Sequence, residues 1–140
     1  MAWPVAAADH GERYVKESDK FPQIRVLTVL KNEQNEQQEN ILPTRWQVIS
    51  KSVTPKISAT CYHFARKYHL ETGFPVGIVV AAVPETKIEK WMTKESRGNC
   101  VAHQPDHETL YNGMIHPLRK FIFMGIVMYQ GESVRLDFDD

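Results

Sequence analysis

The apolar run PVGIVVAAV, residues 75–83, constrains the fold more than any other feature of the sequence. It contains no charged residue, which is typical of a strand that is covered on both faces of a sheet. Two similar runs, IRVLTVL at residues 24–30 and FIFMGIVMY at residues 121–129, are also rich in β-branched and aromatic residues. We therefore expect three buried strands, over residues 24–30, 75–83 and 122–129.

A helix is predicted between the first two of these strands. Ser58 is a favourable N-cap residue, and Gly73 followed by Pro75 ends the helix, which predicts a helix over residues 58–72. Its apolar residues recur at helical spacing and predict a buried stripe. The predicted stripe consists of Ile57, Cys61, Phe64, Ala65 and Tyr68. A second helical pattern covers HETLYNGMIHPL, residues 107–118, and KIEKWM, residues 87–92, predicts a helical turn.

The alternation of strands and helices predicts an α/β fold with a parallel sheet and right-handed crossovers. In such sheets ligands collect at the carboxyl ends of the strands. Pro84, Glu85 and Thr86 follow one predicted strand, and the segment 130–133 (QGES) follows another. We expect these two polar segments to meet at one edge of the sheet.

The chain of 140 residues is expected to form one main domain. Residues 1–20 carry little pattern and are predicted to be an irregular lead-in. Residues 21–134 hold the predicted strands and helices, and residues 135–140 form an acidic tail. Within the domain, KNEQNEQQEN at residues 31–40 has no apolar face, so it is predicted to be a solvated loop.

Composition excludes several classes of function. Seventeen basic residues balance seventeen acidic ones, and the basic residues are scattered, so no nucleic-acid partner is expected. No run approaches the roughly 20 apolar residues that span a bilayer, and the N-terminus lacks the pattern of a signal peptide. No cofactor is indicated, and the compartment stays open.

Three candidate sites of chemistry are weak when judged from the residues alone. Ser133 in GESVR lacks the second glycine of a nucleophile elbow. The spacing of Cys100, His103 and His107 suggests zinc, but an intervening proline breaks any helix that would align the histidines, so no metal is expected. Paired carboxylates, Glu85 with Glu132, would suit acid/base work only at a separation that the sequence does not give.

Four sequence blocks resemble those of a known family. In order, they are SATCYHFARKY, FPVGIVVAAVPETKIEKWM, LYNGMIHPL and GIVMYQGES. Their order and spacing resemble the sialate O-acetylesterase family of SGNH-type carbohydrate esterases, over residues 21–133. The resemblance implies a partial flavodoxin-like, three-layer α/β fold of the SGNH hydrolase type. It also implies hydrolysis of O-acetyl esters on sialic acids or related carbohydrates as the activity of the complete enzyme.

The resemblance assigns roles to five residues. Gln130 and Gly131 match the family's Gln-Gly-Glu block, which makes them candidates for contacts to the oxyanion or the acyl group. Glu132 is expected to orient that loop or to bind substrate, and Asn112 to shape the cleft. Thr86 stands at the end of the family's Gly-Gly-Thr block, whose two glycines are Pro84 and Glu85 in this chain.

The sequence departs from the family at the two blocks that supply the catalytic residues. It contains neither the Gly-Gln-Ser-Asn block of the nucleophile nor the Asp-x-x-His block of its base. A serine without its histidine loses most of its reactivity, so the chain by itself is expected to be inactive. His116 is expected to end its helix rather than to act as a base. Two alternative functions stay open: a noncatalytic carbohydrate-binding or regulatory form, and a subdomain that depends on a partner. Exposed apolar surface also predicts that the chain self-associates.

Overall fold

The computed structural model describes residues 1–97 and 108–130. The chain divides into two compact units. Unit 1 comprises residues 1–30 and 43–84, and unit 2 comprises residues 31–42 and 85–140.

Unit 1 is built on a three-stranded mixed sheet in the order β2-β1-β3. Strand β1 (Ile24–Thr28) runs parallel to β3 (Val76–Val80), with Val26 opposite Ile78. The short strand β2 (Gln47–Val48) is antiparallel to β1. The predicted α/β class and the parallel pairing of the first two predicted strands are confirmed, and both strands are shorter than expected. The antiparallel β2 lies in the RWQVIS segment.

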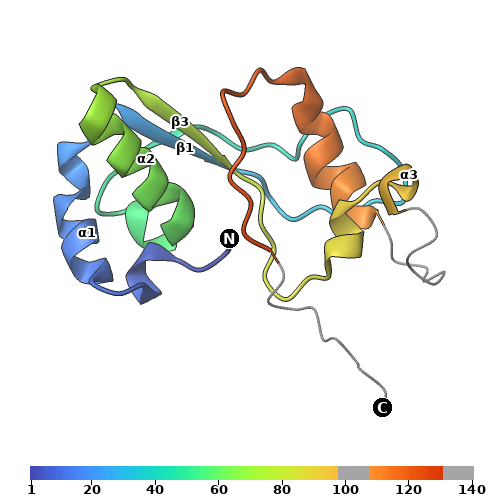
Figure 1. Ribbon diagram of the computed structural model, residues 1–140, viewed down its shortest axis with the longest axis horizontal. Helices are drawn as coiled ribbons and strands as arrows, with labels where there is room; N and C mark the ends of the chain where they lie inside the picture. The colour runs from blue at the N-terminus through green and yellow to red at the C-terminus, as the bar shows by residue number, and fades with distance from the viewer. Residues whose placement is uncertain (98–107, 131–140) are drawn as a thin grey trace, which may run out of the picture. The chain divides into compact units, whose positions relative to one another are not determined.

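Helix α2 (Ala59–Thr72) covers one face of this sheet, as Figure 1 shows. The Ser58 hydroxyl accepts a hydrogen bond from the Cys61 amide, and Gly73 ends the helix in the left-handed conformation with φ of 73°. The helix and both of its end signals are therefore confirmed.

The buried face of α2 differs from the predicted stripe. Tyr62 is fully buried, together with Cys61 and Ala65, whereas Phe64 is half exposed and stacks on Tyr68 at the helix surface. The predicted stripe centred the buried face too near Phe64. Burial of Tyr62 is possible because its hydroxyl donates to the Tyr14 carbonyl oxygen, which satisfies the polar end of the ring.

The first twenty residues are not irregular, contrary to the prediction. They form η1 (Val5–Ala7), helix α1 (Gly11–Glu17) and η2 (Ser18–Lys20), and Val5 lies in the core. A Cβ atom at position 11 would overlap the Val5 carbonyl oxygen, so the close approach of η1 to α1 requires glycine. The short α1 has few apolar residues, and its stability comes from tertiary contacts that a periodicity argument does not detect.

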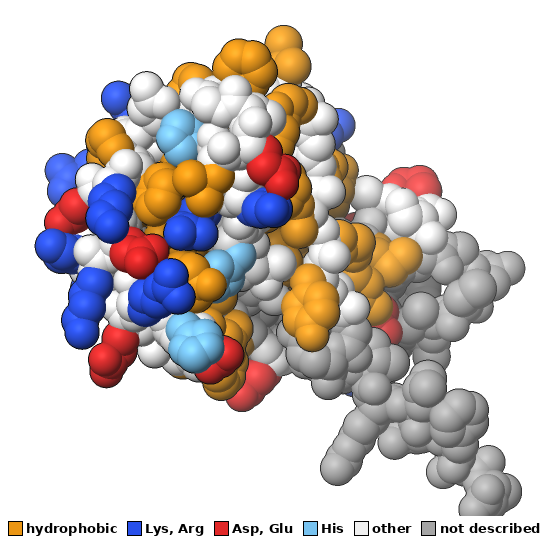
Figure 2. Space-filling model, turned by 60° about the vertical axis from the view of Figure 1, so that its left-hand side comes forward, with side chains coloured by type: hydrophobic (Ala, Val, Ile, Leu, Met, Phe, Trp, Pro, Cys, Tyr) orange, Lys and Arg blue, Asp and Glu red, His pale blue; other side chains and the backbone are white. Residues whose placement is uncertain are grey.

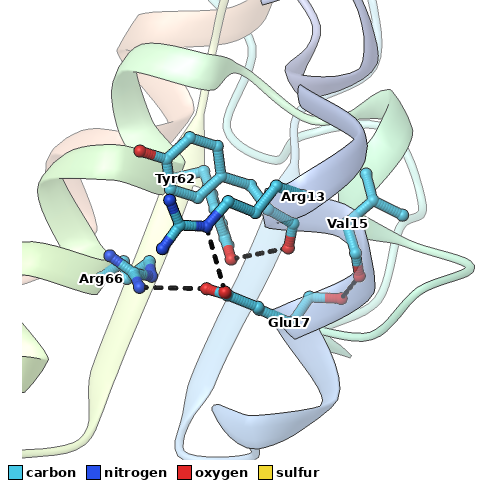
Figure 3. Close-up of polar contacts among 7 residues, drawn as sticks. Arg13, Val15, Glu17, Tyr62 and Arg66 are labelled. Carbon is cyan, nitrogen blue, oxygen red and sulfur yellow. Dashed lines mark hydrogen bonds and ion pairs between the residues drawn. The ribbon is translucent and has the colours of Figure 1, made fainter. Parts of the chain in front are cut away.

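One arginine connects α1 to α2. Arg66 of α2 donates to the Glu17 carboxylate at 3.3 Å, and its guanidinium lies 5.4 Å from the ring centre of Tyr14 and 5.1 Å from that of Phe21. Arg13 also donates to Glu17, so two guanidinium groups share one carboxylate (Figure 3). The hydrogen bond from Arg13 is the main reason why the pKa of Glu17 is lowered. On the face that Figure 2 presents, basic and acidic side chains are interspersed.

Unit 2 holds short helical segments. They are η4 (Ile88–Trp91), α3 (Lys94–Arg97), the π-helical turn η5 (Tyr111–Ile115) and η6 (His116–Lys120). The predicted helical turn at KIEKWM is confirmed. The predicted helix over residues 107–118 is present as η5 and η6, in which Pro117 lies in the first turn of η6 rather than ending the helix.

The third predicted strand is wrong. Residues 122–129 belong to no sheet, and most of their side chains are exposed. The composition of this segment suits a buried strand, but burial needs layers on both faces, and the described part of unit 2 forms no sheet to provide them.

Candidate functional site

The loop of residues 31–42 is held against η5 by Asn112, one of the predicted site residues. Asn112 is buried, and its side-chain amide donates to the carbonyl oxygens of Gln34 at 3.2 Å and Asn35 at 3.1 Å. The backbone carbonyl oxygen of Asn112 accepts a hydrogen bond from the backbone N–H of Gln38 at 2.9 Å. Because the amide group of Asn112 donates to two backbone carbonyls, the residue acts on the loop and has no donor left for a ligand.

Two neighbours of Asn112 complete this attachment. A Cβ atom at Gly113 would overlap the carbonyl oxygen of Asn32, so only glycine permits the loop to approach η5 this closely. His116 is buried, and its Nδ1 lies 2.9 Å from the Gln38 carbonyl oxygen, to which it donates. Its Nε2 faces no hydrogen-bond partner among the described residues.

Sequence reasoning missed this arrangement. Most residues of the loop are exposed, as its lack of apolar side chains predicts, but the prediction did not include the backbone carbonyls that hold the loop in place. The sequence offered a signal for this contact, namely two polar residues and a glycine close together on one short helical segment. Asn112, Gly113 and His116 each contact the backbone of residues 31–42. His116 follows η5 directly and is the first residue of η6, so the helical segment continues to Lys120 and His116 does not end it, contrary to the prediction. It contacts the loop through Nδ1.

Three ion pairs between described residues involve the loop, and two of them, to Lys90 and Lys120, attach it to helical segments. The Glu33 carboxylate lies 2.8 Å from Lys31 Nζ and 3.0 Å from Lys90 Nζ of η4. Hydrogen bonds from Lys31 and then Lys90 lower the pKa of Glu33 to about 2. Glu39 pairs with Lys120 of η6 at 2.7 Å, and the hydrogen bond from Lys120 lowers the pKa of Glu39.

Thr86 and Gln130, which are 44 positions apart, lie together in unit 2. Gln130 Nε2 donates to the Thr86 carbonyl oxygen at 2.9 Å. The Thr86 hydroxyl in turn accepts from Trp91 Nε1 at 3.0 Å, which ties this segment to η4. The segment after β3 and the segment before Gly131 therefore meet, and one amide hydrogen of Gln130 is not used in this contact.

Several residues of the predicted sites lie outside the described part of the chain. They are Gly131, Glu132, Ser133, Cys100, His103 and His107. The acidic tail at residues 135–140 lies outside it as well. Glu85 is described and has a φ of 59°, in the left-handed region, at the turn that follows β3. Among residues 1–97 and 108–130 no group of three metal-ligating side chains occurs, and no helix there has the length and apolar character needed to cross a membrane.

Unit 1 carries a separate groove beside the amino ends of β1 and β3. Its volume is about 480 Å³, and Trp46 lies over Gly77 of β3 with its ring exposed at one side. A Cβ atom at Gly77 would meet the Trp46 ring at 3.3 Å, so glycine gives the indole room to lie on the strand. Gln23 and Arg25 line the same groove and supply polar groups beside the aromatic surface.

In unit 2, residues of the blocks that carry the resemblance make specific contacts: Asn112 holds the loop of residues 31–42, and Gln130 donates to Thr86. Comparison with family models matches residues 7–137 to the carbohydrate esterases described as sialic acid-specific acetylesterases. The chain belongs to this family. The match includes most of the N-terminal segment that was expected to lie outside the domain.

Individual relatives agree with the family. The chain is 25% identical to the sialate O-acetylesterases of Homo sapiens and of Pongo abelii, over 95% of its own length and 29% of theirs. It also resembles the crystal structure of a carbohydrate acetylesterase from Xanthomonas citri, with 33% identity and a TM-score of 0.85. That match covers 95% of this chain and 30% of the other. The chain therefore spans less than a third of the length of these relatives.

Proposed function

We propose that this sialate O-acetylesterase family chain forms the substrate-cleft part of an enzyme that removes O-acetyl groups from sialic acids or related sugars. The contact between Gln130 and Thr86 carries the proposal, because it joins two of the family's sequence blocks through a side chain that keeps one amide hydrogen for a ligand. An amide donor of this kind suits the carbonyl oxygen of an acetyl ester, where negative charge develops during hydrolysis.

The remaining residues have distinct roles in this proposal. Asn112 is a positioning residue, since its amide holds the loop of residues 31–42. Thr86 holds the side chain of Gln130 in place through its carbonyl group. Gly131 and Glu132 follow Gln130 in the sequence, and by resemblance to the family they contribute to the acyl pocket and to sugar binding.

Ligand-observed NMR tests the role of Gln130. We expect saturation transfer from the chain to the acetyl methyl group of an O-acetylated sialic acid, and weaker transfer to the same sugar without the acetyl ester. Gln130→Ala should abolish the difference. Gln37→Ala, which removes an exposed amide from the loop, is the matched control and should leave the difference unchanged. If the Gln130→Ala and Gln37→Ala variants show the same difference in transfer between the two sugars, Gln130 does not contact the acetyl group.

Catalysis by this chain alone is not expected, because its sequence lacks the nucleophile block and the Asp-x-x-His block. Purified chain should hydrolyse an activated acetyl ester no faster than the Ser133→Ala variant does. Turnover that disappears in Ser133→Ala would overturn this expectation and make Ser133 a nucleophile.

The groove at Trp46 favours a second candidate function, noncatalytic carbohydrate binding. A pyranose ring presents a flat apolar face that packs on indole, and Gln23 and Arg25 offer hydrogen bonds to its hydroxyl or carboxylate groups. Sialic acid should change the chain's tryptophan fluorescence, and Trp46→Ala should remove the change. Trp3→Ala, the control at another exposed tryptophan, should preserve it. A response that is lost in Trp3→Ala instead would exclude the groove.

We also propose that the chain associates with copies of itself, because residues 121–129 expose large apolar side chains. Sedimentation equilibrium measures this directly. A single monomeric species throughout the micromolar range would contradict the proposal.

A further inference from the structure

Glu85, in the turn after β3, carries a carboxylate at an unusual backbone position. Its φ of 59° lies in the left-handed region, which favours glycine and is uncommon for a residue with a long side chain. The residue is exposed, and within residues 1–97 and 108–130 its carboxylate forms no ion pair or hydrogen bond, not even with nearby Lys87. Neither a partner nor a favourable backbone conformation therefore explains a glutamate here, and such a position is often a functional one.

The position of Glu85 in the chain places it beside the proposed acyl site. Thr86 follows it directly, about 3.8 Å away between Cα atoms, and the Thr86 carbonyl oxygen accepts from Gln130 Nε2 at 2.9 Å. The residue that holds the acetyl-binding amide and the residue with the free carboxylate are thus neighbours. A sugar whose acetyl group meets Gln130 can therefore bring its ring hydroxyl groups to Glu85.

We propose that Glu85 is a specificity-determining residue that favours acetylated sugars without a charge over acetylated sugars that carry a carboxylate. A carboxylate accepts hydrogen bonds through both oxygens and donates none, so it suits a pair of neighbouring hydroxyl groups on a sugar ring. The same charge repels the carboxylate of a sialic acid. This inference rests on the proposed acyl site at Gln130 and names the class of sugar that the site takes.

The expected size of the preference follows from Coulomb's law. Two like charges about 8 Å apart in water repel each other enough to lower affinity by roughly two- to threefold. Salt at about 0.15 M screens charges over this distance, so it should reduce the preference. Hydrogen bonds to a charged acceptor are stronger than those between neutral groups, and losing them should weaken binding of an uncharged sugar by about tenfold.

Ligand-observed NMR titration with two matched ligands tests the effect of charge. The ligands are an O-acetylated sialic acid and the methyl ester of its carboxyl group, which differ by one negative charge. At low salt the unmodified chain should bind the methyl ester roughly two- to threefold more tightly than the free acid. Glu85→Gln should abolish this difference. Glu12→Gln, the control at an exposed glutamate of α1 in unit 1, should retain it.

Glu85→Gly tests the hydrogen bonds to the sugar. Glycine adopts a positive φ without strain, so this variant should be about as stable as the unmodified chain. It should bind the methyl ester about tenfold more weakly, and Glu85→Gln, which keeps one acceptor oxygen, should weaken binding less. Thermal unfolding of both variants establishes that a loss of affinity does not come from unfolding. Unchanged affinity in Glu85→Gly would show that the carboxylate does not contact the sugar.

The possible results separate this inference from the proposed function. If the free acid binds as tightly as the methyl ester, or if the preference survives in Glu85→Gln, the inference is overturned. The proposed acyl site then still stands, provided that Gln130→Ala weakens binding of both ligands. Tighter binding of the free acid that is lost in Lys87→Met would assign the specificity to Lys87 instead. If neither ligand shows saturation transfer, the proposed function and this inference fail together.

Discussion

At the scale of single residues, Gly113 shows how one backbone position sets the geometry of the candidate site. Its Cα lies so close to the Asn32 carbonyl that any side chain would displace the loop of residues 31–42. Asn112 and His116 depend on that closeness, because both donate to carbonyl groups of the loop. Steric freedom at one position therefore permits hydrogen bonds at two others.

Gly113→Ala should destabilise the chain by about 1–3 kcal/mol, the usual cost of forcing extra volume into a packed site. Gly125→Ala is the matched control, because a Cβ atom there meets no atom within 4 Å. Denaturant unfolding followed by tryptophan fluorescence measures both. Equal stability of the two variants would mean that the loop moves away from η5 without cost.

Glu33 gives a prediction for acid pH. Its pKa is about 2 in the folded chain, against an ordinary value of 4.5, because Lys31 and Lys90 bind the ionised carboxylate. A lowered pKa means that the stabilisation is complete above about pH 4.5 and is lost as the pH falls from there toward 2. The free energy of unfolding should therefore decrease over this range, and the decrease should be shallower in Glu33→Gln.

Glu36→Gln controls for the loss of one carboxylate from the same loop. We expect the free energy of unfolding of this variant to follow that of the unmodified chain between pH 2 and pH 7. If the free energy of unfolding falls equally at acid pH in the Glu33→Gln and Glu36→Gln variants, the pairing of Glu33 with the two lysines does not contribute measurably to stability.

At the scale of secondary-structure elements, the docking of α1 on α2 depends on an arginine that both stacks and forms an ion pair. Arg66 lies near the rings of Tyr14 and Phe21 and donates to Glu17, whereas Arg13 is largely exposed and donates to the same carboxylate. Comparing substitutions of Arg66 and Arg13 therefore distinguishes the contribution of the aromatic contacts from that of the ion pair alone.

Arg66→Lys should cost about 1 kcal/mol, since lysine keeps the charge but loses the planar group that stacks on the rings. Arg13→Lys should leave stability almost unchanged, because an exposed ion pair contributes little. Thermal unfolding of the two variants side by side measures the difference. Equal effects of the two substitutions would show that the aromatic contacts add nothing to the ion pair.

At the scale of the whole molecule, the net charge is expected to control association. The formal charge is zero near pH 7, and the chain gains net positive charge as the pH falls. Identical copies then repel each other, so the association constant should decrease between pH 7.5 and about pH 5.5. Added salt should restore it by screening the repulsion. Sedimentation equilibrium at each pH and salt concentration checks this, and an association constant that is insensitive to both would exclude charge as the control.

The sequence by itself determined the elements whose signals are local. Ser58 and Gly73 mark the ends of α2 through their own backbone and side-chain chemistry, and the apolar runs of β1 and β3 predict strands that pair in parallel. The four sequence blocks were likewise sufficient to indicate the family. Such signals depend on residues close together in the chain, so they can be interpreted without a structure.

Only the tertiary structure decided the remaining features. The rotation of α2 depends on Tyr62 finding a carbonyl acceptor in α1, and the attachment of the loop depends on Asn112 reaching carbonyl groups that are 77 and 78 positions away. Residues 122–129 have the composition of a buried strand, yet they are exposed because a strand also needs neighbours that cover it. Contacts between distant residues decide these outcomes, and local sequence patterns do not encode which partners will be present.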